Sequence, residues 1–291
     1  MNNMVQLSNI PKSIFPSPGT TYQTADEWYT VLADMQMATL LFQHNDIVSS
    51  EDDGRTKYVA RQLFRRLAKQ GRLSTFGFAE DDWSDHCKQA RGTLPAPNGS
   101  GSFRLWSDDF RPANILVDEK DQVLGAIDWE FAYVGPTQFT LDPPWWLLLD
   151  VPEMWDEGID DWASTYERRL QTWLSAVEET EQEFPTGALL LSRYMRDSWA
   201  SGRFWLNYAA RKSWAFDTIY WKYLDQRFFG KRAEDVPTDE LWKTRVHLLI
   251  EEEQAAMESL VQMKMEESKT RILVQWDDAK ARERLSSYLF E

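Results

Sequence analysis

The 291-residue chain carries a formal net charge of −15, with a sequence pI near 4.7, and 43% of its residues are hydrophobic. Aromatic residues make up 14% of the chain and include 15 Trp, which excludes a disordered chain because such side chains gain large burial energies. The acidic charge would repel a phosphate backbone, so we expect no nucleic acid partner.

Cysteine content and hydropathy predict a cytoplasmic protein. Cys87 is the single cysteine, so no intrachain disulfide can form and a reducing compartment is the simplest expectation. The apolar run 145–149 lies between Asp142 and Asp150 and is too short to span a membrane. Residues 1–15 lack the charged segment and apolar core of a secretory signal. We therefore expect no membrane partner.

An irregular segment and two helices open the chain. Residues 1–24 contain Pro11, Pro16, Pro18 and Gly19 among small polar residues and predict an extended lead-in. Thr24 and Glu27 have capping-box spacing, and apolar residues recur on one helical face over 26–43. A second helix is predicted over 54–70 from apolar residues at helical spacing. The basic residues of this second helix are expected to form a solvated face: Lys57, Arg61, Arg65 and Arg66.

The middle of the chain has strand character, and helices return after it. Three short segments rich in β-branched or aromatic residues predict strands over 103–106, 115–117 and 123–127. Helical spacing resumes at residue 159, and its Trp-rich stripes are expected to pack in the core. Further helices are predicted over 188–212, 214–229, 238–266 and 276–289. The predicted fold class is α+β, mostly helical, with a small β-hairpin platform in one domain over 25–291.

Three polar residues in the strand region point to chemistry. Asp109 and Asn114 have D-x-x-x-x-N spacing, and Asp128 closes the third predicted strand. If 118–121 form the turn of an antiparallel hairpin, Asp128 lies opposite the 111–114 region. A carboxylate and an amide oxygen that meet there suit Mg²⁺, and Asp109 can orient a nucleophilic hydroxyl.

These residues resemble the catalytic loop and metal-binding strand of the aminoglycoside phosphotransferase and choline-kinase-like family, which is protein-kinase-like in fold. The resemblance implies Mg²⁺-dependent transfer of the γ-phosphate of ATP or GTP to a small-molecule hydroxyl. It implies that Asp109 is the catalytic base and that Asn114 and Asp128 are metal ligands. It also implies that Arg111 lies near the transferring phosphate. The stretches 128–130 and 141–146 are similar to fungal-type members, and the resemblance covers about 25–275.

Two departures from this family bear on activity. Ser107-Asp108 precedes the catalytic Asp, where the family has His-Gly or His-Arg. No Gly-rich loop following a strand and no phosphate-binding Lys is found upstream, so we expect the C-terminal lobe only, without an N-terminal ATP lobe. Weak nucleotide binding follows from that expectation.

Other interpretations of the same residues stay open. A non-catalytic, pseudokinase-like binding or scaffold module would keep them, and so would a truncated gene product. Asp109, Asn114 and Asp128 could also be ordinary turn and cap residues. A cationic acceptor is compatible with the acidic charge, although solubility alone explains that charge.

Overall fold

Helices account for most of the computed structural model, which describes residues 10–43, 47–85, 91–97, 102–185, 189–270 and 274–290. Small antiparallel strands occupy the middle of the chain, so the predicted mostly helical α+β class is confirmed at this level. Across these ranges, every helix is too short or too polar to cross a membrane. Cys87 lies outside the described residues.

The chain divides into two compact units. Unit 1 comprises residues up to Ser74, a short segment from Trp83, and residues from Tyr208 to the C-terminus. Unit 2 comprises Thr75–Asp82 and Lys88–Asn207. We predicted an extended lead-in over 1–24 and a single domain over 25–291. This division of the chain differs from the two compact units, and it stays a prediction.

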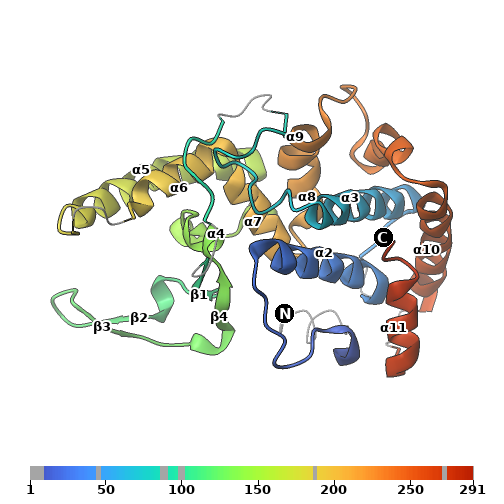
Figure 1. The fold of residues 1–291 in the computed structure, drawn as a ribbon, viewed down its shortest axis with the longest axis horizontal. Helices are drawn as coiled ribbons and strands as arrows, with labels where there is room; N and C mark the ends of the chain where they lie inside the picture. The colour runs from blue at the N-terminus through green and yellow to red at the C-terminus, as the bar shows by residue number, and fades with distance from the viewer. Residues whose placement is uncertain are drawn as a thin grey trace. The chain divides into compact units, whose positions relative to one another are not determined.

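Unit 1 is helical throughout its regular elements (Figure 1). Its α-helices are α2 (Ala25–Phe42), α3 (Glu51–Lys69), α8 (Phe216–Ile219), α9 (Asp225–Phe229), α10 (Glu251–Thr270) and α11 (Asp278–Ser286). Its shorter turns are η1 (Lys12–Ile14), the π-helical η6 (Tyr220–Leu224), η7 (Thr238–Thr244) and η8 (Val246–Leu248). Helix α7 (Arg203–Arg211) spans the boundary between the units.

Capping side chains begin both long helices of the N-terminal region. The Thr24 hydroxyl accepts a hydrogen bond from the Glu27 N–H, which confirms the predicted cap of α2. The Ser50 hydroxyl accepts from the Asp53 N–H, so α3 begins three residues earlier than predicted. Three acidic residues in the first turn of α3 complement the helix dipole there. Helices α2 and α3 then pack against each other.

Arg61 and Arg65 of α3 are buried, so the expectation of a solvated face is wrong for these two residues, whereas Lys57 and Arg66 are partly exposed. The Arg61 side chain is fully buried and donates to both carboxylate oxygens of Asp217 and to the Gln36 carbonyl at 3.0 Å. Its guanidinium also lies over the face of the Phe216 ring. The Arg65 Nε donates to Asp34 Oδ1 at 2.6 Å. Helical spacing alone could not find these ion pairs, because the partners come from distant parts of the chain.

Two predicted helices are interrupted in the structure. The segment predicted over 188–212 is broken at Gly202, whose φ of +84° favours glycine and separates α6 from α7. The segment predicted over 238–266 begins as η7 and η8 and becomes an α-helix only at Glu251. Arg245, between η7 and η8, binds Asp225 through two hydrogen bonds of 2.9 and 3.1 Å, which holds the chain out of helical geometry there.

Unit 2 contains the four strands found in the described residues. They are β1 (Phe103–Ser107), β2 (Ile115–Val117), β3 (Val123–Ala126) and β4 (Ala132–Pro136). Its helices are α4 (Thr137–Thr140), α5 (Ile159–Glu181) and α6 (Leu191–Ser201). Its 3-10 turns are η2 (Pro112–Asn114), η3 (Trp129–Phe131), η4 (Trp145–Leu147) and η5 (Pro152–Met154).

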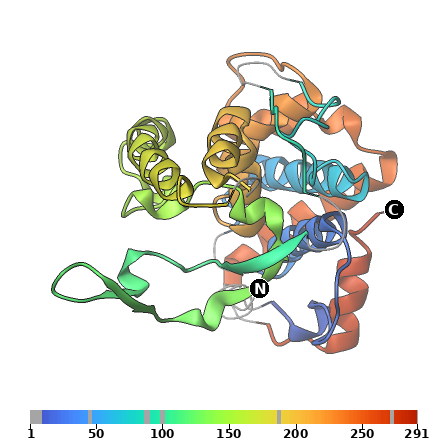
Figure 2. The ribbon, with the colours of Figure 1, turned by 60° about the vertical axis from the view of Figure 1, so that its left-hand side comes forward.

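The strands form two antiparallel pairs rather than the three-stranded region predicted. Strand β1 pairs with β4, which was not predicted, and β2 pairs with β3. The β2–β3 hairpin projects beyond the β1–β4 pair (Figures 1 and 2). The chain therefore passes from one pair to the other twice, once after β1 and once before β4.

We expect Asp217→Ala to lower the free energy of unfolding by about 3–5 kcal/mol, because it leaves the buried Arg61 guanidinium without its carboxylate. Urea unfolding followed by circular dichroism measures this change. Glu178→Ala is the control, because Glu178 pairs with Arg196 where both side chains are about half exposed, and it should cost about 1 kcal/mol or less. Equal effects of the two substitutions would contradict a buried ion pair at Arg61.

Candidate functional site

Two connections between the strand pairs carry the candidate site. The first, residues 108–114, leads from the end of β1 to the start of β2, and the second, residues 127–131, leads from the end of β3 to the start of β4. Ser107 pairs with Ala132 at one end, and Ile115 pairs with Ala126 at the other. Because both ends are paired, the two connections lie side by side.

Two backbone hydrogen bonds join these connections directly. The Ile127 N–H donates to the Asn114 carbonyl at 2.9 Å, and the Asp108 N–H approaches the Phe131 carbonyl at 3.5 Å. The first bond places Asp128 one residue from the point where the connections touch. Asn114 and Asp128 therefore meet at the same end of the hairpin.

Asn114 is the anchor of the first connection. It ends the η2 turn, is 6% exposed, and donates from its side-chain Nδ2 to the Asp109 carbonyl at 2.8 Å. This bond closes the loop between the two residues. Because the amide nitrogen is used in it, the amide oxygen is the atom of Asn114 suited to a hard cation.

Asp128 has a strained backbone conformation. Its φ of 64° and ψ of 53° lie in the left-handed region, which a residue other than glycine rarely adopts. Its side chain is exposed just before the η3 turn. Such conformations cost free energy and cluster at active sites and ligand-binding segments.

Asp109 and Arg111 lie at the exposed edge of the same loop. The Arg111 Nε is 3.8 Å from Asp109 Oδ1, and the side chains are 51% and 32% exposed. A solvent-screened pair at this distance contributes little stability. Both groups can therefore turn toward a ligand at small cost.

Aromatic side chains next to the candidate residues brace the two connections, and sequence reasoning missed them. The Phe110 and Trp129 rings lie 5.8 Å apart, one from each connection. The Trp129 Nε1 donates to the Ala126 carbonyl at 2.9 Å, and the Trp106 Nε1 donates to Asp108 Oδ1 at 2.9 Å. The available signal was that Phe110 follows Asp109 and Trp129 follows Asp128 in the sequence.

Ser107 stands where the family that the sequence resembles has a histidine. Its hydroxyl oxygen is buried and finds no hydrogen-bond partner within the described part of the chain. The contact between Phe110 and Trp129 instead holds the two connections together.

The oxygen atoms of Asn114 and Asp128 suit a cation that binds together with a phosphate group better than a cation coordinated by the protein alone. Within the described ranges, no group of three or more His, Cys, Asp or Glu side chains is placed to hold a metal. Asn114 and Asp128 offer one amide oxygen and one carboxylate. Mg²⁺ commonly takes one or two protein ligands and completes its shell with water and phosphate oxygens, so this pair fits it.

A sequence model of the phosphotransferase enzyme family matches residues 14–184, which is more than half of the chain. The chain belongs to the phosphotransferase enzyme family. The matched span includes Asp109, Asn114 and Asp128 together with both strand pairs. Comparisons with curated proteins and with solved structures found no match. The similarity of 128–130 and 141–146 to fungal-type members stays a prediction.

Substitutions at Asp128 separate backbone strain from ligand binding. We expect Asp128→Gly to leave the free energy of unfolding within about 1 kcal/mol of the parent, because glycine adopts a positive φ freely. We expect Asp128→Val to lower it by about 1–3 kcal/mol, because a β-branched residue is strained there. Thermal unfolding measures both changes.

Asp121→Gly is the matched control for Asp128→Gly. Asp121 also has a positive φ, of 59°, but lies in the turn of the β2–β3 hairpin. Both glycine variants should remain folded, and only Asp128→Gly should lose binding of Mn²⁺ with ATP, measured by electron paramagnetic resonance. Loss of Mn²⁺ binding in both variants would remove the special role assigned to Asp128.

Proposed function

We propose that this chain is a phosphoryl-transfer domain whose reaction site consists of Asp109, Asn114 and Asp128. The two hydrogen bonds of Asn114 carry the proposal, one to the Asp109 carbonyl and one from the Ile127 N–H. They bring all three residues onto two adjoining connections. Membership of the phosphotransferase enzyme family supports the same reaction class.

Each residue has a separate role in the proposed reaction. Asp109 accepts a hydrogen bond from the acceptor hydroxyl, orients it and takes its proton as the oxygen attacks the γ-phosphorus of ATP or GTP. The bond from the γ-phosphorus to the β–γ bridging oxygen breaks, so the nucleoside diphosphate leaves. Asn114 Oδ1 and the Asp128 carboxylate would hold Mg²⁺. Arg111 is able to turn from Asp109 toward an oxygen of the transferring phosphoryl group.

When bound, Mg²⁺ supplies positive charge that offsets the negative charge of the phosphate oxygens. The hydrogen bond from the Ile127 N–H to the Asn114 carbonyl keeps Asp128 at the end of the hairpin before any ligand arrives. Less reorganisation is then needed on binding.

We infer that the residues before β1 supply no nucleotide-covering lobe. Within 10–43, 47–85 and 91–97, the regular elements before β1 are one 3-10 turn and two α-helices, with no strand. A nucleotide-covering lobe of the kinase type needs strands that carry a Gly-rich loop and a Lys. Charge-assisted hydrogen bonds contribute about 1.5–3 kcal/mol each, so lacking two or three of them weakens binding by two or more powers of ten.

A non-catalytic binding or scaffold module is the second candidate function. Ser107 in the place of the usual histidine and the helical segment before β1 both favour it. In that case the reaction-site residues would act as turn and cap residues only. Asn114 already makes such a bond to the Asp109 carbonyl.

Titration with Mg²⁺-ATP and Mg²⁺-GTP separates the two candidates. We expect dissociation constants in the millimolar range, about a hundredfold or more weaker than micromolar binding. Saturation-transfer NMR of the nucleotide measures this binding. Asp128→Ala should remove this weak binding, because the carboxylate would hold the Mg²⁺ that accompanies the phosphates. Asp156→Ala is the control, since Asp156 is exposed in the loop before α5.

Three outcomes are informative. Weak binding that requires Asp128 supports the phosphoryl-transfer site. Binding that is identical in the parent and Asp128→Ala, or absent from both, favours the non-catalytic module. Micromolar binding that depends on Asp128 would contradict the inference that the nucleotide lacks a covering lobe.

A further inference from the structure

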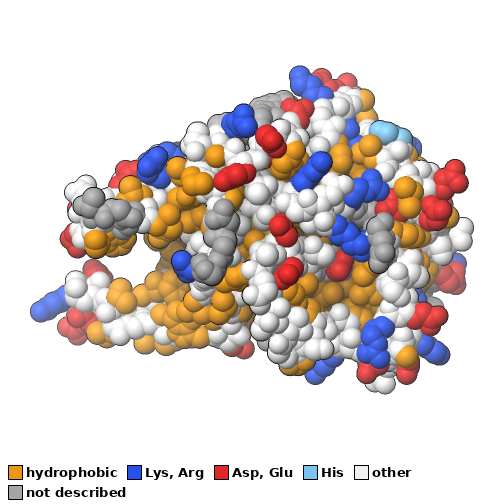
Figure 3. Space-filling model, in the orientation of Figure 1, with side chains coloured by type: hydrophobic (Ala, Val, Ile, Leu, Met, Phe, Trp, Pro, Cys, Tyr) orange, Lys and Arg blue, Asp and Glu red, His pale blue; other side chains and the backbone are white. Residues whose placement is uncertain are grey.

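A cavity of about 320 Å³ lies within unit 2, beside the candidate site. Its walls are dominated by aromatic side chains, among them Phe110, Trp129, Trp145, Trp146 and Trp173. Figure 3 shows a hollow between the arm that carries the strands and the arm that carries α5, with hydrophobic side chains gathered on both. The volume falls at the lower end of the range of small-molecule sites, about 300–1,000 Å³.

The cavity adjoins both connections of the candidate site. Ser107 and Phe110, which line it, lie on either side of Asp109 in the chain, and Trp129, which also lines it, directly follows Asp128. A compound bound in the cavity would therefore be next to the loop of the proposed catalytic base. This is the relation that an acceptor must have to the proposed reaction site.

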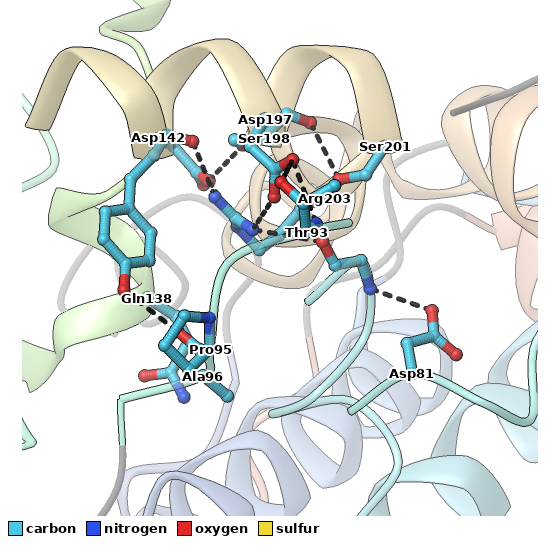
Figure 4. A network of polar contacts seen from close by, with 12 residues as sticks. Asp81, Thr93, Pro95, Ala96, Gln138, Asp142, Asp197, Ser198, Ser201 and Arg203 are labelled. Carbon is cyan, nitrogen blue, oxygen red and sulfur yellow. Dashed lines mark hydrogen bonds and ion pairs between the residues drawn. The ribbon is translucent and has the colours of Figure 1, made fainter. Parts of the chain in front are cut away.

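Asp142 is the one ionisable side chain among the residues that line the cavity, and its charge is compensated. It is 3% exposed, and its carboxylate accepts hydrogen bonds from the Ser198 hydroxyl at 2.6 Å and from the Asn207 amide at 2.7 Å. The Arg203 guanidinium lies 3.6 Å from the same carboxylate (Figure 4). It also stacks on the Phe78 ring. The Asp142 carboxylate therefore interacts with side chains in the interior of unit 2.

The far wall of the cavity is held in place by contacts from two helices. The Trp146 and Trp173 rings meet edge to face at 5.3 Å, and the Trp173 Nε1 donates to the Met195 sulfur at 3.3 Å. The Tyr166 hydroxyl donates to the Pro144 carbonyl at 2.8 Å and fixes the segment before η4. Residues of α5 and α6 therefore present Trp146 as a fixed wall, which suits a rigid ligand.

We propose that this cavity is the acceptor site and that it takes a small, neutral, ring-bearing alcohol. This inference rests on the proposed phosphoryl-transfer function. Flat rings stack favourably on the Trp and Phe faces, and burying them removes apolar surface from water. A cation would gain from the electron-rich ring faces, but it would lose hydration in a cavity whose one carboxylate is already paired.

Isothermal titration calorimetry with two matched probes tests the proposal, without nucleotide or Mg²⁺. The probes are 2-naphthalenemethanol and the protonated amine 2-naphthylmethylammonium, which share the ring system and differ in charge. We expect the alcohol to bind at least tenfold more tightly than the ammonium compound. Equal or tighter binding of the ammonium compound, or no binding of either, would overturn the proposal.

Substitutions locate the binding. Trp146→Ala should weaken binding of the alcohol at least tenfold, whereas Trp146→Phe, which keeps an aromatic wall, should weaken it less than threefold. Trp214→Ala is the control, because Trp214 is half exposed, belongs to unit 1 and does not line the cavity. If Trp146→Phe and Trp146→Ala bind as the parent does, the alcohol binds elsewhere and the inference fails.

A phosphoryl-transfer assay tests the proposed function separately from the acceptor site. Phosphorus NMR would follow transfer from Mg²⁺-ATP to 2-naphthalenemethanol, in which the alcohol oxygen bonds to the γ-phosphorus, ADP leaves, and the proton passes to Asp109. Formation of the naphthylmethyl phosphate supports both proposals. Tight binding without transfer counts against the proposed function alone, and transfer to polar alcohols without binding in the cavity counts against the acceptor site alone.

Discussion

The hydrogen bond from the Ile127 N–H to the Asn114 carbonyl is the constraint on which the candidate site depends. It joins the two connections between the strand pairs, at the last residue of the first connection, Asn114, and next to Asp128 near the start of the second. Asn114 then reaches back to the Asp109 carbonyl. Asp109, Asn114 and Asp128, of which the first and last are 19 positions apart, are linked by these two hydrogen bonds. Both bonds are accepted by backbone carbonyls and neither uses the carboxylate of Asp109 or Asp128, so these two carboxylates stay open to a ligand.

Aromatic residues give the site its surroundings. The residues that directly follow Asp109 and Asp128 are Phe110 and Trp129, and each faces both the other ring and the neighbouring cavity. The same contact therefore braces the two connections and forms one wall of the proposed acceptor site. A change in either ring should affect the order of the loop and the shape of the cavity together.

Buried ion pairs explain how a chain with a net charge of −15 accommodates arginines in its interior. In unit 1, Arg61 pairs with Asp217 and Arg245 with Asp225. In unit 2, Arg203 lies beside Asp142. In each pair the arginine compensates the charge of one carboxylate. In unit 2 the compensated carboxylate is that of Asp142, so the cavity has no uncompensated charge among its lining residues. A buried pair of this kind adds little net stability relative to well-packed apolar residues, but removal of one partner is strongly destabilising because it leaves a buried charge uncompensated.

The sequence by itself determined the succession of a helical, a strand-rich and a second helical region, the cap of α2, and the spacing of Asp109, Asn114 and Asp128, because these depend on residues close together in the chain. The β2–β3 hairpin was predictable for the same reason. The tertiary structure alone decided the pairing of β1 with β4, the burial of Arg61 and Arg65, and the interruption of the helix predicted over 238–266. It also decided that Trp146 and Trp173 line a cavity instead of packing in a closed core. These features depend on partners far away in the chain, and neither periodicity nor local propensity carries information about such partners.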